Sequence, residues 1–360
     1  MSAASQISQR KPIIVNEGKE RYSEDGEGTM RGGNILFRRT PHPDWFFMNG
    51  YPGGDFVTRV PWERRILFLM EPPMIEQYGP DYVKQFGVLV SPYAFDGYPG
   101  RLILDNTCLG WHTGLYSRTN PFKKLPDAEN FPIPEKTKMI SVISSFDKKT
   151  RVGHRKRIAF ISALLTRYGE KIDYFGRGLN PVEDKLDAIV PYKYHIAIEN
   201  CNLNNYWTEK LTDAWICWSL PIYCGDPSIL RKIPDPLGME VIDISDPMSA
   251  MRHIDYILDN DIYSSRTSAI AACRKWAIKK SNVLTRVCEI IESSDESVLA
   301  KPCLDHDDVI RRLPYKRRSF GEILGRTVSW CAGVSYVYNI KRKYGKILRQ
   351  RTEKSDRRTV

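Results

Sequence analysis

Apolar residues in the second half of the chain alternate between short continuous runs and segments with helical spacing. Residues 194–198 form an apolar run that stops at Glu199 and Asn200, as a buried parallel strand does at its carboxyl end. After a polar loop, Thr208 can cap a helix whose apolar residues recur every three or four positions, and residues 222–224 are typical of the next strand. This strand–helix–strand unit gathers its polar side chains at the carboxyl edge of a sheet, where open α/β folds bind ligands.

The same alternation extends over residues 139–292 and predicts a parallel sheet with helices on its faces. Helices are expected after residue 153 and between residues 247 and 292. Before residue 110, short strand-like runs are separated by Gly/Pro turns, which indicates a more irregular α/β domain. The predicted strands are residues 35–37, 45–48, 66–70, 86–91, 102–104, 139–143, 172–175, 194–198, 222–224 and 239–244.

Changes in composition divide the chain into four segments. Residues 1–33 are polar, rich in Gly, Glu and Ser and without periodicity, so we expect a flexible segment. Residues 120–135 contain four prolines and little periodicity, which predicts a linker between a first domain over residues 34–130 and a second over residues 136–300. Residues 301–360 form a basic tail.

Composition is that of an ordinary soluble protein. The 360 residues are enough for two hydrophobic cores, and 42% of them are hydrophobic. We find no apolar run near the ~20 residues of a membrane span, and the N-terminus lacks the hydrophobic stretch of a signal peptide. The eight cysteines have no regular spacing, so we expect buried thiols in a reducing compartment rather than disulfides or a zinc site. These features predict a cytoplasmic protein.

The net charge of +11 is concentrated at the carboxyl end of the chain. Residues 311–360 carry 15 Lys/Arg and 3 Asp/Glu, while the rest carries 39 basic and 40 acidic residues. Apolar and basic positions between residues 330 and 351 have the spacing of an amphipathic helix that lies on an anionic membrane surface. Nucleic acid would also match the charge. However, the tail has no known base-reading motif and no cluster of aromatic side chains on which bases could stack. We therefore expect a protein peripheral to the membrane and no nucleic-acid partner.

Glu209 and Lys210 stand in the first turn of the central helix. Free backbone N–H groups there favour an anion, and a lysine adds positive potential. Glu209 can accept hydrogen bonds from a pair of hydroxyls, as carboxylates do with ribose, and Asn200 and Tyr206 add neutral hydrogen-bonding groups. A capped helix with a solvated ion pair would explain Thr-Glu-Lys alone. Convergence with Glu199 on the same edge favours a ligand site instead.

Residues 193–229 resemble the donor-binding motif of the α-1,3-fucosyltransferase family. That motif joins a hydrophobic strand, Glu-Asn, a Tyr-x-Thr-Glu-Lys turn and a Pro-Ile/Val strand that ends in Gly. Cys201 stands where the family has Ser or Thr, and Trp207 replaces an aliphatic residue. The resemblance is strong over residues 139–229, loose over 44–110 and absent at both termini. Its matching residues are Ile198-Glu199-Asn200, Tyr206-Trp207-Thr208-Glu209-Lys210 and Pro221-Ile222-Tyr223-Cys224-Gly225.

The resemblance implies two Rossmann-like domains that face each other across a cleft, the GT-B arrangement, with the acceptor bound by the first domain and the donor by the second. It implies transfer of fucose from GDP-fucose to a hydroxyl of a glycan, with inversion. Because basic side chains would surround the diphosphate, we expect no metal or other cofactor. Glu71, which follows a strand and precedes Pro72-Pro73, matches the family's proposed catalytic base. Arg157 and Lys210 would neutralise the departing diphosphate. The residues expected to bind the donor are Arg157, Glu199, Asn200, Tyr206, Glu209 and Lys210.

Without the resemblance, simpler interpretations of these residues compete with the functional ones. A basic surface turn explains residues 154–157 as well as an anion site does, and Arg155 is the second choice for the diphosphate. Glu71 alone would be a solvated loop glutamate, and Asp96 and Asp105 are weaker candidates for the base. His112 is a candidate for acceptor contact, although a structural role is the simpler interpretation.

Alternatives also remain for metal binding and for the function. The Asp-x-Asp sequences at residues 259–261 and 305–307 follow no predicted strand, so we attribute them to chance rather than to a metal site. A related transferase that uses another nucleotide sugar would fit the same pattern. So would a non-catalytic protein that binds membrane or nucleic acid on a transferase scaffold.

Overall fold

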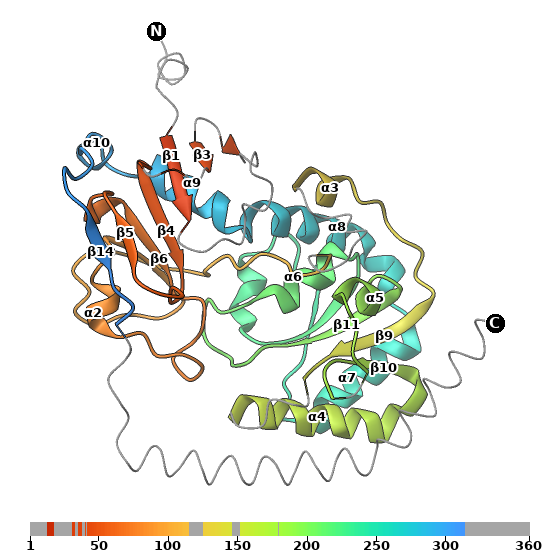
Figure 1. Cartoon of the computed structure of the whole chain (residues 1–360). Helices are drawn as coiled ribbons and strands as arrows, with labels where there is room; N and C mark the ends of the chain where they lie inside the picture. Colours follow the sequence, from red (N-terminus) through yellow and green to blue (C-terminus); the bar gives the residue numbers. More distant parts are fainter. Residues whose placement is uncertain are drawn as a thin grey trace, which may run out of the picture. The chain divides into compact units, whose positions relative to one another are not determined.

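The part of the chain that the structure describes divides into two compact units. The computed structural model describes residues 13–17, 31–32, 35–37, 40, 42–114, 125–145, 152–178 and 180–313. Of the described residues, the first unit contains those up to Leu109 and those from Asn282 to Leu313, and the second contains those from Gly110 to Ser281. Figure 1 shows the elements of both units, coloured along the sequence.

The first unit is built on a mainly parallel sheet. Its strand order is β2-β3-β1-β4-β6-β7-β8, and only the β2–β3 pair is antiparallel among the described strands of this sheet. A separate antiparallel pair joins β5 (Phe56–Thr58) to β14 (Asp308–Ile310). The strands of the larger sheet are Ile13–Glu17 (β1), Arg31–Gly32 (β2), Ile35–Phe37 (β3), Trp45–Asn49 (β4), Arg65–Phe68 (β6), Val88–Ser91 (β7) and Arg101–Leu104 (β8).

Successive side chains of this sheet enter two different apolar layers, because strand residues alternate between faces. Trp45 and Phe47 of β4 pack in one cluster with the apolar face of α9 (Val283–Glu292). Phe46 and Met48 of the same strand pack in another cluster with α2 (Pro80–Val83). The short helices η1 (Trp62–Arg64) and α10 (Glu296–Leu299) complete the described elements of this unit.

The second unit contains a parallel sheet with the strand order β10-β9-β11-β12-β13. The chain leaves β9 for β10 on one side and returns on the other side of β9 as β11. In open α/β sheets, ligands bind where the strand order reverses in this way, outside the carboxyl ends of the two strands. The switch point here lies between β9 and β11. The strands are Lys138–Ile143 (β9), Ile172–Phe175 (β10), Tyr192–Ile198 (β11), Leu220–Cys224 (β12) and Glu240–Val241 (β13).

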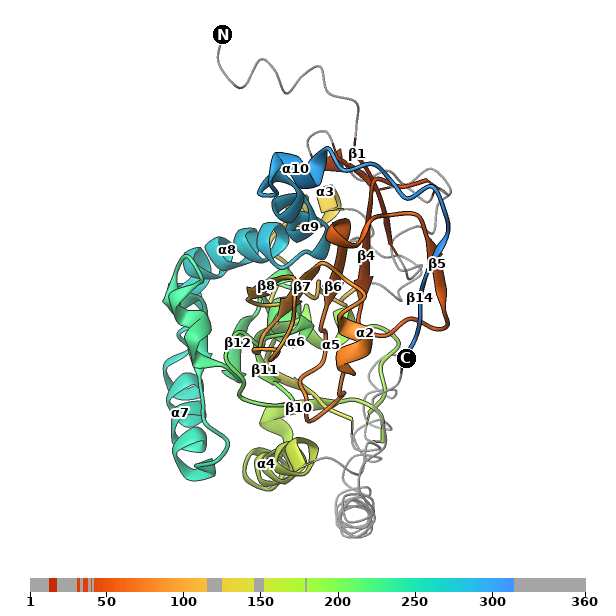
Figure 2. The same ribbon diagram turned by 90° about the vertical axis from the view of Figure 1, so that its left-hand side faces the viewer.

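Helices pack against this sheet and against one another. α4 (Val152–Tyr168) and α7 (Pro247–Asn260) lie side by side (Figures 1 and 2), and the Tyr168 hydroxyl bonds the Met251 carbonyl at 2.9 Å. Trp215 of α6 contacts Trp276 of α8 edge-on, with ring centroids 6.2 Å apart. The other described helices are α3 (Leu125–Asn130), η2 (Gly169–Lys171), α5 (Lys185–Ile189), α6 (Glu209–Ile216), η3 (Pro227–Arg231), η4 (Pro236–Gly238) and α8 (Tyr263–Lys280).

The prediction of a flexible segment over residues 1–33 is wrong for its described part. β1 pairs in parallel with β3 on one side and with β4 on the other, and Val15 is buried. The strand is a short apolar run inside a polar sequence, and it is stabilised by neighbours from later in the chain. Such a run has too little local periodicity to be recognised from the sequence.

The limits predicted for the linker and for the tail also differ from the structure. Part of the proposed linker is α3, whose buried Ala128 packs with Ile216 and Ile278 inside the second unit. The start of the proposed tail contains β14, and Asp308 pairs with the buried Arg65 of the first unit at 2.6 Å. The predicted second domain extends to residue 300, but α9 belongs to the first unit, because its apolar face completes that core.

The prediction of an α/β protein with parallel sheets is confirmed. The predicted strands are present, although β13 is shorter than the expected run of residues 239–244. The cleft of the GT-B arrangement stays a prediction. Within the described ranges, no helix combines the length and the apolar character needed to cross a membrane. The amphipathic helix predicted between residues 330 and 351 lies outside the described residues.

Candidate functional site

Polar residues gather at the carboxyl end of β11, next to the switch point. β11 ends at Ile198, so Glu199 and Asn200 follow it directly, and Thr208 precedes α6 as its N-cap. The Thr208 hydroxyl accepts a hydrogen bond from the backbone N–H of Lys210 (3.4 Å). A strand end and a helix start, with their free backbone groups, therefore meet at one edge of the sheet.

Glu199 is a buried side chain that links the end of β11 to the start of α6 by hydrogen bonds. Its side chain is 0% exposed, and Oε1 accepts hydrogen bonds from the backbone N–H (2.7 Å) and the hydroxyl (3.0 Å) of Thr208. Burial raises the pKa of Glu199, while the Lys210 ammonium group, 3.6 Å away, opposes that shift. A Cβ atom on Gly225 would lie 2.8 Å from Glu199 Cγ, so glycine at this turn leaves room for the carboxylate. The contacts of Glu199 thus hold the site together from inside.

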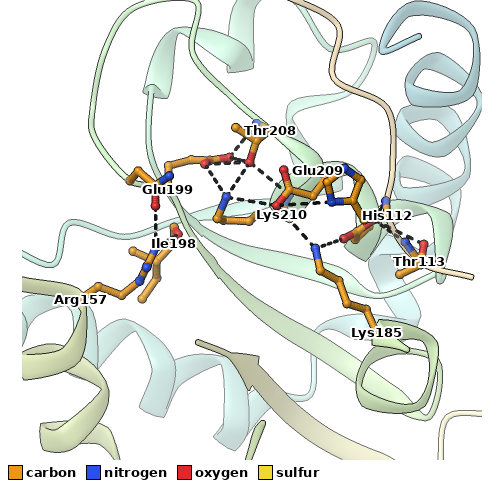
Figure 3. A network of polar contacts seen from close by, with 11 residues as sticks. His112, Thr113, Arg157, Lys185, Ile198, Glu199, Thr208, Glu209 and Lys210 are labelled. Carbon is orange, nitrogen blue, oxygen red and sulfur yellow. Dashed lines mark hydrogen bonds and ion pairs between the residues drawn. The ribbon is translucent and has the colours of Figure 1, made fainter. Parts of the chain in front are cut away.

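Among the described residues, three basic side chains lie around one oxygen of Glu209 (Figure 3). Lys210 Nζ is 3.2 Å from Oε1, Lys185 Nζ is 3.5 Å away and His112 Nδ1 is 4.0 Å away. Burial by itself would raise the pKa of Glu209, but these three neighbours hold it well below its ordinary value. The side chain remains 13% exposed. Glu209 is therefore an ionised hydrogen-bond acceptor that solvent still reaches.

The basic members of this cluster have pKa values shifted in opposite directions. Burial disfavours the charged form of Lys210, but Glu209 and Glu199 outweigh it and raise the pKa of the ammonium group. Burial lowers the pKa of His112, although Glu209 and Asp213 oppose the shift. At neutral pH the cluster therefore presents a lysine cation and a neutral imidazole.

Asp213 connects the cluster to a segment much earlier in the chain. Its Oδ1 accepts hydrogen bonds from the backbone N–H groups of His112 (2.6 Å) and Thr113 (3.0 Å), and Lys185 Nζ lies 2.6 Å from Oδ2. Neither Lys185 nor Asp213 is among the site residues predicted from the sequence. Asp213 follows Glu209 by one helical turn, and this spacing could have placed it on the same face of α6. No comparable pattern marks Lys185.

Arg157 extends from α4 to the end of β11. Its Nη1 group donates to Asn200 Oδ1 (3.0 Å) and to the Ile198 carbonyl (3.4 Å), and the residue is 6% exposed. Burial lowers the pKa of Arg157, while Glu199 and Glu209 favour its charged form. The structure therefore brings Arg157 into direct contact with Asn200, another residue expected to bind the donor.

Tyr206 is buried in the loop between β11 and α6. The neighbouring Asn205 has a left-handed backbone conformation (φ 60°), and its N–H donates to Asp226 at 2.7 Å. Trp207 is buried too, and Lys232 Nζ lies 5.2 Å from the centre of its ring. These contacts fix the loop that carries Tyr206, whose role toward a nucleotide stays a prediction.

Glu71 belongs to the first unit, where it lies in the loop that follows β6. Its side chain is partly buried. Of the weaker candidates for a base, Asp96 is exposed, whereas Asp105 pairs with Arg286 at 2.7 Å. The role of Glu71 as a base stays a prediction.

The two Asp-x-Asp sequences make structural contacts with distant parts of the chain. Asp261 ends α7 in a left-handed conformation, accepts a hydrogen bond from the Tyr194 hydroxyl (3.0 Å) and pairs with Lys193. Asp307 pairs with Arg59 at 2.6 Å. In the part of the chain that the structure describes, no group of three His, Cys, Asp or Glu side chains is placed to hold a metal ion.

Residues 133–299 match the C-terminal domain of glycosyltransferase family 10, the fucosyltransferases. The chain thus contains a domain that matches this family. The matched region contains Arg157, Lys185, Glu209 and Lys210, so the charged cluster at the end of β11 lies inside the family domain except for His112.

Two fucosyltransferases illustrate the similarity in sequence. Alpha-(1,3)-fucosyltransferase FucT of Helicobacter pylori is 30% identical over 76 residues, which are 21% of this chain and 16% of the relative. Alpha-(1,3)-fucosyltransferase 4 of Bos taurus is 27% identical over 153 residues, which are 40% of this chain and 36% of the relative. The matched part thus spans less than two thirds of the length of either relative. A crystal structure of an α1,3-fucosyltransferase with GDP-fucose aligns with a TM-score of 0.48 at 16% identity, over 82% of this chain and 93% of that chain.

Proposed function

We propose that this family 10 glycosyltransferase transfers fucose from GDP-fucose to a hydroxyl group of a glycan, with inversion at the anomeric carbon. The proposal rests on the cluster of Arg157, Glu209 and Lys210 at the carboxyl edge of β11, inside the region that matches the fucosyltransferase family. Relatives named as α-(1,3)-fucosyltransferases support the same reaction.

The donor would bind at the start of α6. Lys210 is 25% exposed and stands beside the free N–H groups of the helix N-terminus, where a diphosphate is stabilised by both. Arg157 supplies a second cation, and Asn200, which it contacts, can bond a nucleotide oxygen. Glu209 is ionised and accepts hydrogen bonds from the ribose hydroxyls. Tyr206 orients the nucleotide.

In the reaction, an acceptor oxygen attacks the anomeric carbon as the bond from that carbon to the diphosphate oxygen breaks. Glu71 takes the proton of the acceptor hydroxyl as general base. Negative charge then develops on the departing GDP, and Arg157 and Lys210 stabilise it electrostatically. Because these cations are already in place, we infer that no divalent metal is needed. We also propose that the basic tail attaches the enzyme to the cytoplasmic face of an anionic membrane.

A thermal-shift panel with GDP, UDP, CDP and ADP tests the donor class. A nucleotide that binds only the folded protein stabilises it by about 2.7 kcal/mol at a hundredfold excess over Kd. We expect GDP to raise the melting temperature of the full chain most, and Lys210→Ala to reduce that rise. A larger shift with UDP would indicate a transferase for another sugar nucleotide. No shift with any nucleotide would favour a non-catalytic protein.

A further inference from the structure

The carboxylate of Glu209 is held asymmetrically. Lys210, Lys185 and His112 all approach Oε1, at 3.2, 3.5 and 4.0 Å. Among the described residues, none bonds Oε2, and the side chain as a whole is 13% exposed. Figure 3 shows the three basic groups converging on a single oxygen of the carboxylate. One oxygen is therefore fixed by the protein, and the other is left to accept from a ligand.

Lys185 reaches Glu209 from a position that other contacts determine. It is the first residue of α5, whose N-cap Asp184 accepts hydrogen bonds from the N–H groups of Leu186 (2.8 Å) and Gly114 (2.7 Å). The ammonium group bonds Asp213 at 2.6 Å and thus bridges two carboxylates one turn apart on α6. These two anions hold the partly buried Lys185 ammonium group in one place, because a lysine cation withdrawn from water is stabilised by charge partners.

We propose that Lys185 is a positioning residue for the recognition of the donor's ribose, acting through Glu209. By holding Oε1, it aims Oε2 at the two ribose hydroxyls of a nucleotide diphosphate sugar. This inference rests on the proposed function, because it assumes a nucleotide donor at the start of α6. It assigns to Lys185 a task different from that of Lys210, which faces the diphosphate.

Removing the Lys185 cation would leave Glu209 and Asp213 without their shared counter-ion. Two carboxylates one helical turn apart repel each other, and Glu209 is then free to rotate toward Lys210 alone. The loss should appear in the binding of ribose hydroxyls and leave the interaction with the diphosphate in place. A role limited to folding would not separate these two parts of the ligand.

The experiment compares the binding of GDP and 2′,3′-dideoxy-GDP to the full chain by calorimetry. We expect the wild-type protein to bind GDP about tenfold or more tightly than the dideoxy nucleotide, since hydrogen bonds to a carboxylate distinguish them. Lys185→Met should weaken GDP binding by about the same factor and leave dideoxy-GDP nearly unchanged. Lys185→Arg, which keeps the charge, should retain most of the preference for GDP. Lys138→Met removes an exposed ion pair with Asp173 in the same unit and should change neither ligand.

The outcomes separate this inference from the proposed function. Equal weakening of both nucleotides by Lys185→Met, or no change with either, would overturn the positioning role. Wild-type protein that binds both nucleotides equally would remove Glu209 from ribose recognition and overturn the inference, while GDP binding itself would stand. Wild-type protein that binds neither would overturn the proposed function as well. If Lys185→Met does not fold, Lys185→Gln keeps a hydrogen-bond donor for Asp213, and the same loss of preference is expected.

Discussion

Glu199 and Glu209 both lie near the Lys210 ammonium group, yet their surroundings give them different properties. Glu199 is fully covered and bonds Thr208, and burial raises its pKa. Glu209 remains partly exposed, and its basic neighbours hold its pKa well below the ordinary value. The same residue type is therefore a fully buried contact between strand and helix in one position and a partly exposed, ionised acceptor in the other. Burial and the number of charge partners decide the difference.

Substitutions of Glu71 and Lys210 should affect GDP affinity and kcat differently if the proposed mechanism holds. A base acts only as the acceptor proton leaves, so Glu71→Gln should lower kcat by ~10²–10⁴-fold and leave GDP affinity nearly intact. Lys210 faces charge that is present before the reaction, so Lys210→Ala should weaken GDP binding and lower kcat together. Calorimetry gives the affinity, and turnover is measured on one acceptor. Near-normal turnover by folded Glu71→Gln would remove it from the mechanism and make Asp96 the next residue to test.

The buried imidazole of His195 should lower the free energy of unfolding at acidic pH. It is buried, bonds Ser141 at 2.8 Å, and burial lowers its pKa to about 3. The unfolded chain takes up this proton near pH 6.5, so stability falls by up to ~1.4 kcal/mol per pH unit from there down to about pH 3. His195→Gln cannot titrate, and its free energy of unfolding in urea should depend less on pH over that range. Parallel pH profiles of the two proteins would contradict this account.

The connection between the end of β11 and the start of α6 positions the polar side chains at this edge of the second unit. α6 has only eight residues, Glu209–Ile216, and most of them are buried. A helix this short is not stable by itself, so packing and its N-cap must hold it in place. Thr208 supplies the cap and also bonds both oxygens of Glu199. Its hydroxyl therefore links the helix start to the strand end.

Substitutions of Thr208 should show how much this hydroxyl contributes to the free energy of unfolding. Thr208→Val keeps the shape but loses the N-cap and the bonds to a buried carboxylate, which should lower the free energy of unfolding by ~2–4 kcal/mol. Thr208→Ser keeps the hydroxyl and serves as the matched control, with a much smaller loss. Urea unfolding of both variants gives the comparison. Equal stability of the two variants would show that Glu199 does not depend on Thr208.

At the scale of the whole molecule, the chain enters the second unit at Gly110 and returns to the first at Asn282. α9 then fills one face of the first sheet, and β14 pairs with β5. Neither residues 34–130 nor residues 136–300 would therefore contain a complete unit. Activity therefore has to be measured on the whole 360-residue chain.

Turnover of the full chain with a GDP-sugar should survive excess EDTA. Arg157 and Lys210 stand at the proposed diphosphate site, and fixed cations stabilise a leaving diphosphate without a metal. The assay compares initial rates before and after chelation. Activity that disappears with EDTA and returns with Mn²⁺ would contradict the prediction. The Asp-x-Asp sequences would then be candidates for a metal site again.

The basic tail should attach the enzyme to anionic membranes. Each Lys or Arg near such a surface contributes roughly 1 kcal/mol, so full-length protein should float with anionic liposomes and detach as salt is raised. A chain truncated after residue 325 should remain unbound and still bind GDP. Liposomes of neutral lipid are the control. Flotation of the truncated protein, or its loss of GDP binding, would contradict the separation of tail and donor site.

The sequence by itself determined the strand–helix–strand unit and the polar residues at its edge. Glu199, Asn200, Glu209 and Lys210 are brought together by a strand end and the first turn of the following helix. Such neighbours are close in sequence, and local spacing fixes which side of the element they occupy. The motif that these residues share with a family added Arg157, which the structure places against Asn200.

Only the tertiary structure decided the partners that come from distant parts of the chain. Lys185 and the backbone of His112 contact Asp213 because three separate segments pack at one edge. No periodicity in the sequence predicts these contacts. The placement of β1 between β3 and β4, and of α9 on the first sheet, has the same origin. A short apolar segment is stabilised by whatever covers it, and the covering surface exists only once the chain has folded.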